Sequence, residues 1–384
     1  MDITPFCIAI PDTDLADLQA RLARTRLPAA NLDLGWSAGI APGYLAQLLE
    51  HWRERYDWRI HEARLNRLPQ YRARIASAHG DIDVHFVHQR GTGPDPLPLV
   101  LTHGWPGSFL EMEAIVQLLA DPGAHGADPL DSFHVVAPSL PGFGFSSAPT
   151  SLDFGPYEVA GLWADLMTGL GYSRFGAQGG DIGAAVSAWL GQRFPAQVAG
   201  MHLNYIPGSY RPPQDGSVPN ADEQDFLRRA AEFLDADGAY ARIQATRPQT
   251  LAVGLNDSPA GLAAWIGEKF HAWADGPVDL DTLLTNISLY WFTGTIGSSF
   301  GMYTSVRARP LAPQGRVIPP LGLALFPFEL PLPPRSWVER CFDVRRWKQM
   351  PAGGHFAALE QPAALAREIR DFFRPLRAAA PPRM

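Results

Sequence analysis

The chain has 384 residues, of which 46% are hydrophobic and 18% charged, and its formal net charge at pH 7 is −7. This length suits one large elaborated domain or two to three units, and the composition is typical of a soluble globular protein. The mild acidity excludes nucleic acid as an expected partner, and the distant cysteines Cys7 and Cys341 exclude a disulfide framework and a CxxC metal site.

The amino-terminal sequence MDITPFCIAIPDTD lacks a basic region followed by a long apolar stretch, so we expect no signal peptide. The sequence also lacks the run of roughly 18 apolar residues that a membrane-spanning helix needs. We therefore expect a cytoplasmic protein without a membrane span.

The first segment, residues 1–78, is predicted to be a helical extension. Its leucines recur at helical spacing after a cap-like Asp12-Thr13-Asp14, and a second amphipathic pattern runs from Tyr44 to Trp52. The stretch DWRIHEARLNRLPQYRARI is rich in Trp, Tyr and Arg. We expect these helices to form a layer that packs against the rest of the protein.

Residues 79–209 alternate short apolar strands with helical stretches. The strand patterns are IDVHFVH, PLVLT, FHVVAP, RFGAQG and VAGMHL, and the apolar helix AAVSAWLGQRF follows the fourth of them. This alternation predicts an α/β fold with a mostly parallel central sheet and helices on both faces. We assign these residues to the first part of the core.

The strand signal fades over residues 210–310, where EQDFLRRAAEFL, GLAAWIGEKFHAWA and DTLLTNISLYWF are helix-like. Strand patterns return in residues 311–384, with PLGLALFPFE and, beyond an arginine-rich stretch, KQMPAGGHF. A helical segment inserted between strands indicates a lid over the edge of the sheet. The last segment is expected to complete the core.

The pentapeptide Gly179-Gly180-Asp181-Ile182-Gly183 has the form of a nucleophile elbow. In such an elbow a strand ends in a sharp turn and a helix begins at once, so the neighbours of the nucleophile must be small. Here the nucleophile position holds a carboxylate, which can displace a group at carbon and leave an alkyl ester. The alternative is a glycine-rich turn in which Asp181 only caps the helix that follows.

An elbow of this kind requires an acid and then a histidine after later strands, the chain order of the α/β-hydrolase fold. Glu329 lies just past the apolar stretch GLALFPF, and His355 follows two glycines in MPAGGHF. We expect Glu329 to be the acid and His355 the base. The alternatives are Asp343 as the acid, a solvated carboxylate at Glu329 and a buried structural histidine at His355.

The loop His103-Gly104-Trp105-Pro106-Gly107 follows the strand PLVLT. In this fold the loop at that position brings a backbone N–H close to the nucleophile. We expect the Trp105 and Ile182 amides to form an oxyanion hole, which is worth several kcal/mol to a tetrahedral intermediate. The alternative is a Gly-Pro turn with a packed tryptophan. His103 is expected to hold the loop in shape.

An aspartate nucleophile is compatible with epoxide opening and with displacement of a halide from carbon. An epoxide oxygen needs an acid, which tyrosine hydroxyls from a lid can supply, whereas a halide needs only weak donors such as indole N–H groups. Tyrosines occur in the lid segment at positions 240, 290 and 303.

The chain resembles the microsomal-type epoxide hydrolases, including their soluble bacterial and fungal relatives and the juvenile-hormone epoxide hydrolases. The resemblance runs almost from end to end. PFCIAIPDTDLADLQARLARTRLP and YDWRIHEARLNRLPQYRARI are similar to the N-terminal segment of that family, and THGWPGSFLEM, PSLPGFGFS, GGDIG, GLNDSPAGLAAWIGEKF and PAGGHFAALEQP are similar to its core and lid motifs.

The resemblance implies an α/β-hydrolase fold in which Asp181 is the nucleophile, Glu329 the charge partner and His355 the base. It further implies that Tyr240, in DGAYARIQ, and Tyr303, in SSFGMY, are the lid acids. Tyr290 has no counterpart in the family pattern and is expected to be a packing residue.

The resemblance also implies a small apolar epoxide and water as substrates, with no metal or organic cofactor. It favours a homodimer and gives no reason to expect a membrane anchor. Two other functions stay open, a haloalkane or haloacid dehalogenase on the same fold and a non-catalytic binding protein built on it.

Overall fold

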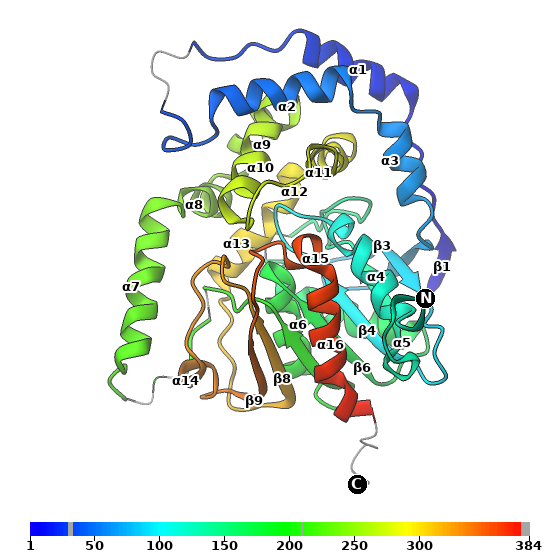
Figure 1. The fold of residues 1–384 in the computed structure, drawn as a ribbon, viewed down its shortest axis with the longest axis vertical. Coiled ribbons are helices and arrows are strands. Elements are labelled where there is room, and N and C mark those ends of the chain that lie inside the picture. Colours follow the sequence, from blue (N-terminus) through cyan, green and yellow to red (C-terminus); the bar gives the residue numbers. More distant parts are fainter. Residues whose placement is uncertain (30–33, 152, 209, 213, 215, 378–384) are drawn as a thin grey trace.

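The structure, a computed structural model, describes residues 1–29, 34–151, 153–208, 210–212, 214 and 216–377. Within this part of the chain nine strands form one sheet in the order β1-β2-β3-β5-β4-β6-β7-β8-β9 (Figure 1). The strands are β1 (Asp2–Pro5), β2 (Gln70–Ile75), β3 (Ile82–Gln89), β4 (Leu97–Thr102), β5 (Phe133–Pro138), β6 (Phe175–Gly179), β7 (Val198–Leu203), β8 (Val317–Leu325) and β9 (Phe342–Gln349).

The strands from β5 to β9 pair in parallel, whereas β1, β2, β3 and β5 pair antiparallel to one another. Parallel strands are covered on both faces, which explains why β4, β5, β6 and β7 are almost continuous apolar runs. This is the mostly parallel α/β sheet that the alternation of elements predicts, and it is the α/β-hydrolase fold that the resemblance implies. The carboxyl ends of the parallel strands meet at one edge of the sheet.

Helices cover the two faces of the sheet (Figure 1). On one face lie α4 (Glu113–Ala120), α15 (Ala357–Glu360) and α16 (Pro362–Arg377). On the other face α5 (Pro156–Gly169) and α6 (Asp181–Arg193) pack against the strands and each other. Most of α6 is buried, so the residue at its start is firmly placed relative to the sheet.

The N-terminal segment contributes strands as well as helices. It contains α1 (Asp12–Ala23), α2 (Pro42–Glu54) and α3 (Trp58–Leu65), as expected. The stretch QYRARI, however, is strand β2, which pairs with β1 and β3, and its grouping with the helical part of the sequence was wrong. Ala73 and Ile75 are buried while Arg74 is exposed, the two-residue period of a strand, which the density of aromatic and basic residues obscured.

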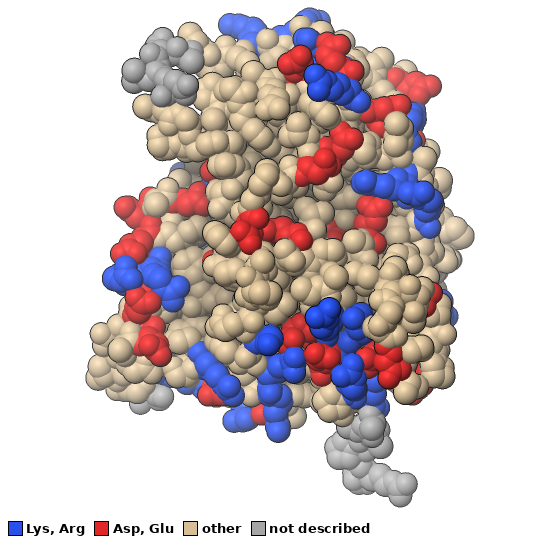
Figure 2. Space-filling model, viewed as in Figure 1, with Lys and Arg blue, Asp and Glu red and all other residues tan. Residues whose placement is uncertain are grey.

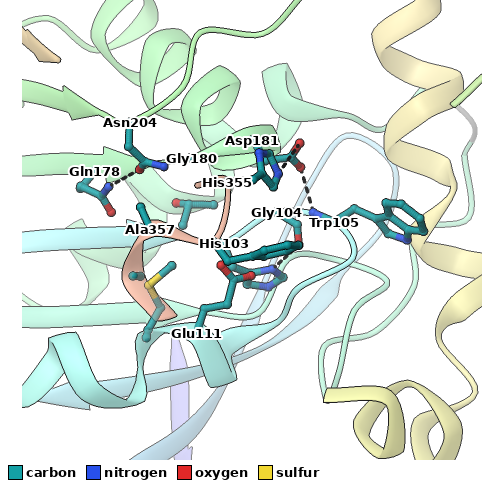
Figure 3. Close-up of a pocket in the computed structure, with 14 residues that line it drawn as sticks. His103, Gly104, Trp105, Glu111, Gln178, Gly180, Asp181, Asn204, His355 and Ala357 are labelled. Atoms are coloured by element: carbon teal, nitrogen blue, oxygen red, sulfur yellow. Dashed lines mark hydrogen bonds and ion pairs between the residues drawn. The ribbon is translucent and has the colours of Figure 1, made fainter. Parts of the chain in front are cut away.

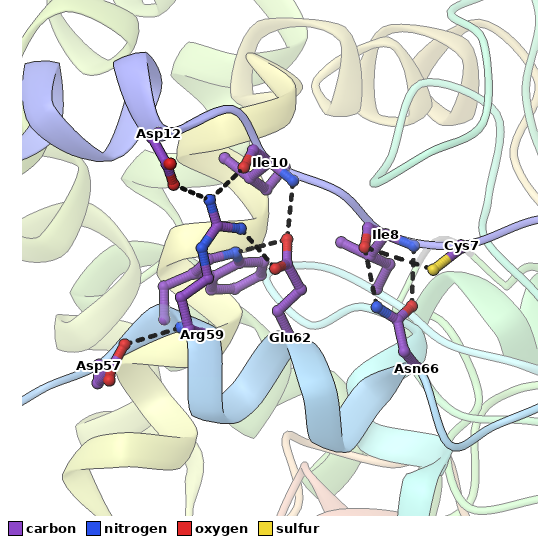
Figure 4. Close-up of polar contacts among 9 residues, drawn as sticks. Cys7, Ile8, Ile10, Asp12, Asp57, Arg59, Glu62 and Asn66 are labelled. Carbon is purple, nitrogen blue, oxygen red and sulfur yellow. Dashed lines mark hydrogen bonds and ion pairs between the residues drawn. The ribbon is translucent and has the colours of Figure 1, made fainter.

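The extended chain between β1 and α1 is fixed to α3 by a side chain of that helix and by the side chain of the residue that follows it (Figure 4). Glu62 accepts hydrogen bonds from the Ile10 N–H at 2.7 Å and from the Trp58 indole N–H at 3.1 Å. Asn66 bonds both the N–H and the carbonyl oxygen of Ile8, each at 2.8 Å. These bonds satisfy backbone groups that would otherwise lack partners.

Between β7 and β8 the described chain is helical and lies beyond the carboxyl ends of the strands (Figure 1). The helices are α7 (Ala221–Ala236), α8 (Ala239–Thr246), α9 (Pro248–Asp257), α10 (Pro259–Trp273), α11 (Leu280–Thr293), α12 (Ile296–Ser299) and α13 (Gly301–Ala308). A short helix, α14 (Arg335–Val338), follows β8. We refer to α7–α13 as the lid helices.

The charged side chains visible in Figure 2 are of mixed sign. Lys and Arg gather near β9 and α16, where acidic side chains lie among them. Arg346, for example, pairs with Glu368 and Asp371, and Arg374 pairs with Asp131. No helix in the described part of the chain is long and apolar enough to cross a membrane.

Candidate active site

Asp181 stands at the turn where β6 ends and α6 begins. It has φ of +47°, and among the described residues it is the one non-glycine with positive φ. A positive φ raises the conformational energy of any residue that has a Cβ, and non-glycine residues with positive φ are found mainly where function requires them. The turn is tight, since a Cβ on Gly183 would lie 2.0 Å from the Thr102 carbonyl oxygen. The N-terminus of α6 also favours the negative charge of the Asp181 carboxylate.

Glu329 and His355 come from loops after β8 and β9, and the structure brings both to Asp181. The His355 Nδ1 atom lies 2.6 Å from Glu329 Oε1, and Nε2 lies 3.6 Å from Asp181 Oδ2. The side chains of His355 and Glu329 are 3% and 1% exposed. Asp343, the alternative acid, lies on β9 and pairs with Arg316 and Arg345 instead. The arrangement orients the imidazole and leaves Nε2 facing the carboxylate.

Opposing effects set the pKa of His355. Burial lowers it, but the negative charge of Glu329, the hydrogen bond to Glu329, the Asp181 carboxylate and, once it is ionised, Glu111 prevail and raise it to about 9. The imidazole is therefore protonated at neutral pH. Any event that neutralises Asp181 removes one of the causes and lowers the pKa of His355.

The loop after β4 reaches the nucleophile position with a backbone donor (Figure 3). The Trp105 N–H donates to Asp181 Oδ1 at 2.8 Å. Ile182 occupies the first turn of α6, where backbone N–H groups have no partner within the helix. His103 holds the loop, since its Nδ1 lies 3.0 Å from the Gly104 carbonyl oxygen and its Nε2 accepts from the Leu140 N–H at 3.1 Å.

Tyr240 on α8 and Tyr303 on α13 lie over this loop. The ring of Tyr240 stacks on Trp105 with centroids 5.3 Å apart, and the centroid of Tyr303 is 5.9 Å from that of Tyr240. Burial raises the pKa of both hydroxyls well above 10, and Asp181 adds to the shift. Both phenols therefore stay protonated and can donate a hydrogen bond.

Tyr290 is a buried packing residue, as the sequence led us to expect, but it also makes a hydrogen bond. It is buried on α11, and its hydroxyl donates to the Gly107 carbonyl oxygen at 2.7 Å. The side chain thus bonds the loop that carries Trp105.

Two cavities meet at Asp181, the one residue common to the described linings of both. The larger has a volume of about 230 Å³ and is mostly apolar, with Tyr240, Tyr303, Phe233 and Leu330 in its wall. It exceeds the ~150 Å³ of a protein cavity that binds benzene. The smaller measures about 20 Å³, which suffices for about one water molecule. Its wall includes polar side chains from the core (Figure 3), namely His355, Glu111, Gln178 and Asn204.

Glu111 is a site residue that the sequence did not single out. Its Oε1 lies directly on Gly107, where a Cβ would come within 1.4 Å of it. Burial raises the pKa of Glu111 to about 8, so that the carboxyl is mostly neutral at pH 7 and can donate a hydrogen bond. No local pattern marks Glu111 in the sequence, because its place beside His355, Gln178 and Asn204 is set by the packing of distant segments.

Two family profiles match the chain up to residue 262. The family profile described as "Epoxide hydrolase N terminus" matches residues 3–112, and the profile "alpha/beta hydrolase fold" matches residues 98–262. The first match includes the loop of Trp105, and the second includes Asp181.

Full-length relatives extend the similarity beyond these segments. A putative epoxide hydrolase of Stigmatella aurantiaca (strain DW4/3-1) is 44% identical over 383 residues, which cover 98% of this chain and 86% of that protein. Epoxide hydrolase 1 of Oryctolagus cuniculus is 36% identical, with 96% and 88% covered. The solved structure of Aspergillus niger epoxide hydrolase matches with a TM-score of 0.86 at 34% identity, covering 98% of this chain and 97% of that one.

Proposed function

This chain belongs to the microsomal-type epoxide hydrolase family, and we propose that it opens the epoxide ring in two steps through an ester on Asp181. The substrate class is a small apolar epoxide, and the product is a vicinal diol. The observation that carries the proposal is the carboxylate at the elbow, which accepts from the Trp105 N–H and faces the imidazole of His355.

In the first step the epoxide occupies the larger cavity. Trp105 holds Oδ1 of Asp181, which leaves Oδ2 to attack a ring carbon. The carbon–oxygen bond of the ring breaks as the ester bond forms, and Tyr240 or Tyr303 gives its proton to the ring oxygen while the other stabilises it. The high pKa of both phenols supports this role, because they are protonated when the substrate arrives.

In the second step a water molecule in the smaller cavity attacks the ester carbonyl carbon, and His355 accepts its proton. Negative charge then develops on Oδ1, where the Trp105 and Ile182 amides stabilise it. The tetrahedral intermediate collapses and the diol leaves with a proton from His355. The proton left on the Asp181 carboxyl returns to the tyrosinate formed in the first step, which restores both the carboxylate and the phenol. Glu329 orients the imidazole, and the neutral carboxyl of Glu111 is placed to bond the water.

The second step is expected to become faster as the pH rises from neutral to alkaline. The base must be unprotonated, and the pKa of His355 is about 9 while Asp181 is charged. Ester formation removes that charge, so the ester hydrolyses with an apparent pKa below 9, and its rate constant is low under acidic conditions and levels off above that pKa. Single-turnover measurement of ester decay over this pH range checks the expectation.

A decay rate that falls through the same range would contradict it. Glu111, with a pKa of about 8, ionises in the same window, and its negative charge raises the pKa of His355. The rise of the ester-hydrolysis rate constant with pH should therefore be broad in the native enzyme. In the variant Glu111→Gln the same rise should span a narrower pH range.

The lid tyrosines test the choice of reaction. Tyr240→Phe and Tyr303→Phe are each expected to slow ester formation by about 10²-fold or more, because each removes a donor worth ~2–4 kcal/mol to the opening alkoxide. Ester hydrolysis should change little, since it does not involve the ring oxygen. The double variant should lose almost all epoxide opening. Rapid-quench kinetics with detection of the ester by mass measures both steps.

Tyr44→Phe is the matched control, because Tyr44 lies on α2 and packs against Trp36 outside the site. Tyr290→Phe is not a silent control, since that hydroxyl bonds the Gly107 carbonyl. Formation of the ester at the native rate in Tyr303→Phe would refute the assignment of the two acids. Release of chloride from a haloalkane, together with no turnover of any epoxide, would select a dehalogenase instead.

A further inference from the structure

We infer that Asn286 of the lid helix α11 is a positioning residue for the second step, because it fixes the loop whose N–H is aimed at Asp181. The inference rests on the proposed two-step reaction and deepens it. It concerns a side chain that is not among the lining residues of either cavity described above.

The amide of Asn286 joins two residues of the loop. Its Nδ2 donates to the Pro106 carbonyl oxygen at 2.8 Å, and its Oδ1 accepts from the Ser108 hydroxyl at 2.8 Å. Ser108 in turn accepts from the Leu110 N–H at 3.3 Å. The amide therefore clamps Pro106 and Ser108, the residues on either side of Gly107, with its donor and its acceptor both used.

Tyr290 adds a third bond from the same helix to the same loop, at the Gly107 carbonyl oxygen. A spacing of four residues places Asn286 and Tyr290 on one face of α11. The carbonyl groups of Pro106 and Gly107 are both held by α11, while the Trp105 N–H donates to Asp181. The loop is thus held on one side by α11 of the lid and on the other by the carboxylate of Asp181 at the elbow.

The cost of burying Asn286 argues that these bonds matter. Its side chain is 2% exposed, and all its neighbours in the sequence from Leu283 to Tyr290 are buried as well. An amide in such surroundings costs several kcal/mol unless it is hydrogen-bonded, and asparagine is a poor residue for a helix interior. An apolar residue would suit the packing of α11 better, so the amide is explained by the loop that it holds.

Helix α11 is itself anchored to the N-terminal segment. His51 on α2 lies 2.7 Å from the carboxylate of Asp281 in the first turn of α11. The N-terminal segment, α11 and the loop of Trp105 therefore form one continuous set of contacts that ends at Asp181.

The two steps should respond differently when this clamp is lost. In the first step the carboxylate gives up its charge, so a donor at Oδ1 stabilises the starting state more than the transition state. In the second step charge returns to Oδ1, and the donor must be in place. Displacement of the Trp105 N–H should therefore slow ester hydrolysis and leave ester formation unchanged or slightly faster, the opposite of the effect of removing a lid tyrosine.

The test compares Asn286→Leu, which keeps a similar volume without polar atoms, with Asn286→Ala, which leaves space. Both are expected to slow ester hydrolysis by about tenfold to 10²-fold, the cost of a catalytic group displaced by about 1 Å. Ester formation should stay within about threefold of the native rate, and the ester should accumulate at steady state. Rapid-quench kinetics and intact-protein mass give both rate constants and the adduct.

Thr285→Val is the matched control. Thr285 is fully buried beside Asn286 on α11, but it bonds Tyr56 and the backbone of its own helix rather than the loop. We expect it to lower the melting temperature about as much as the Asn286 variants while leaving both rate constants native.

Equal slowing of both steps in the Asn286 variants, or the same kinetic change in Thr285→Val, overturns the inference, because either result indicates a general structural role. Native kinetics in both Asn286 variants overturns it as well. The ester trapped in His355→Gln tests the proposed function separately. If that ester forms while the Asn286 variants show native kinetics, only the inference about Asn286 fails. If no ester forms in His355→Gln, the proposed two-step reaction fails as well.

Discussion

The variant Asp181→Asn is expected to lose steady diol formation by about 10⁴-fold or more, on the scale of a removed nucleophile. An amide is a poor nucleophile, so no ester can form at the elbow. The fold should survive, because asparagine tolerates positive φ better than most residues and the φ at this position is +47°. Diol formation from a purified epoxide, with a melting curve for the variant, measures both expectations.

Slow deamidation would restore aspartate and imitate residual activity, so the mass of the variant must be checked before and after the assay. Near-native turnover by a sample that still carries the amide would refute the nucleophile assignment. A burst of diol that grows with storage time and with the mass shift of deamidation would instead support it.

The variant His355→Gln is expected to stop after the first step. The ester should accumulate on Asp181 and raise the protein mass by the mass of one substrate, because the water lacks its base. Loss of a general base costs about 10²–10⁴-fold, so turnover should be nearly absent while the first step stays fast. Intact-protein mass after a short exposure to epoxide shows the adduct, and peptide mapping places it at the elbow.

Loss of activity in His355→Gln without any adduct would mean that the histidine serves the first step or the fold. The pair Asp181→Asn and His355→Gln separates these possibilities, since the double variant should carry no adduct at all. Glu329→Gln should lose less activity than His355→Gln, because the imidazole is still present. It would, however, lose the negative charge that helps to raise its pKa.

The sequence predicted the residues whose positions follow from chain order. Once GGDIG is taken as an elbow, the acid and the histidine have to follow after later strands, and Glu329 and His355 lie in the loops that the structure brings to Asp181. Asp343 could be set aside only from the structure, where it points to arginines on and beside β9. The pattern of elements also predicted the fold, because almost every strand of the core is a short apolar run between turns.

The sequence did not identify Glu111 or Asn286, and the reason is the same for both. Their relevance depends on which groups they meet from other parts of the chain, and that is set by packing between segments far apart in the sequence. Asn286 lies 178 residues from Ser108. Tyr240 and Tyr303 on the lid helices were found through the resemblance to a family rather than through spacing, since neither has a local motif that marks an acid. The strand β2 was missed because its alternation is short, with the exposed Arg74 between the buried Ala73 and Ile75, and because arginine and tyrosine occupy the positions before them.

Asp181 separates the cavity proposed for the epoxide from the cavity proposed for water, and this separation affects how enzymes of this kind can change their substrate. The wall of the larger cavity includes side chains of α7, α8 and α13, whereas the described wall of the smaller cavity belongs to the core. Substitutions in those helices can therefore alter which epoxide fits without touching the groups that handle water. Selection for a new substrate can act on one side of the nucleophile while the hydrolytic half of the cycle is inherited unchanged.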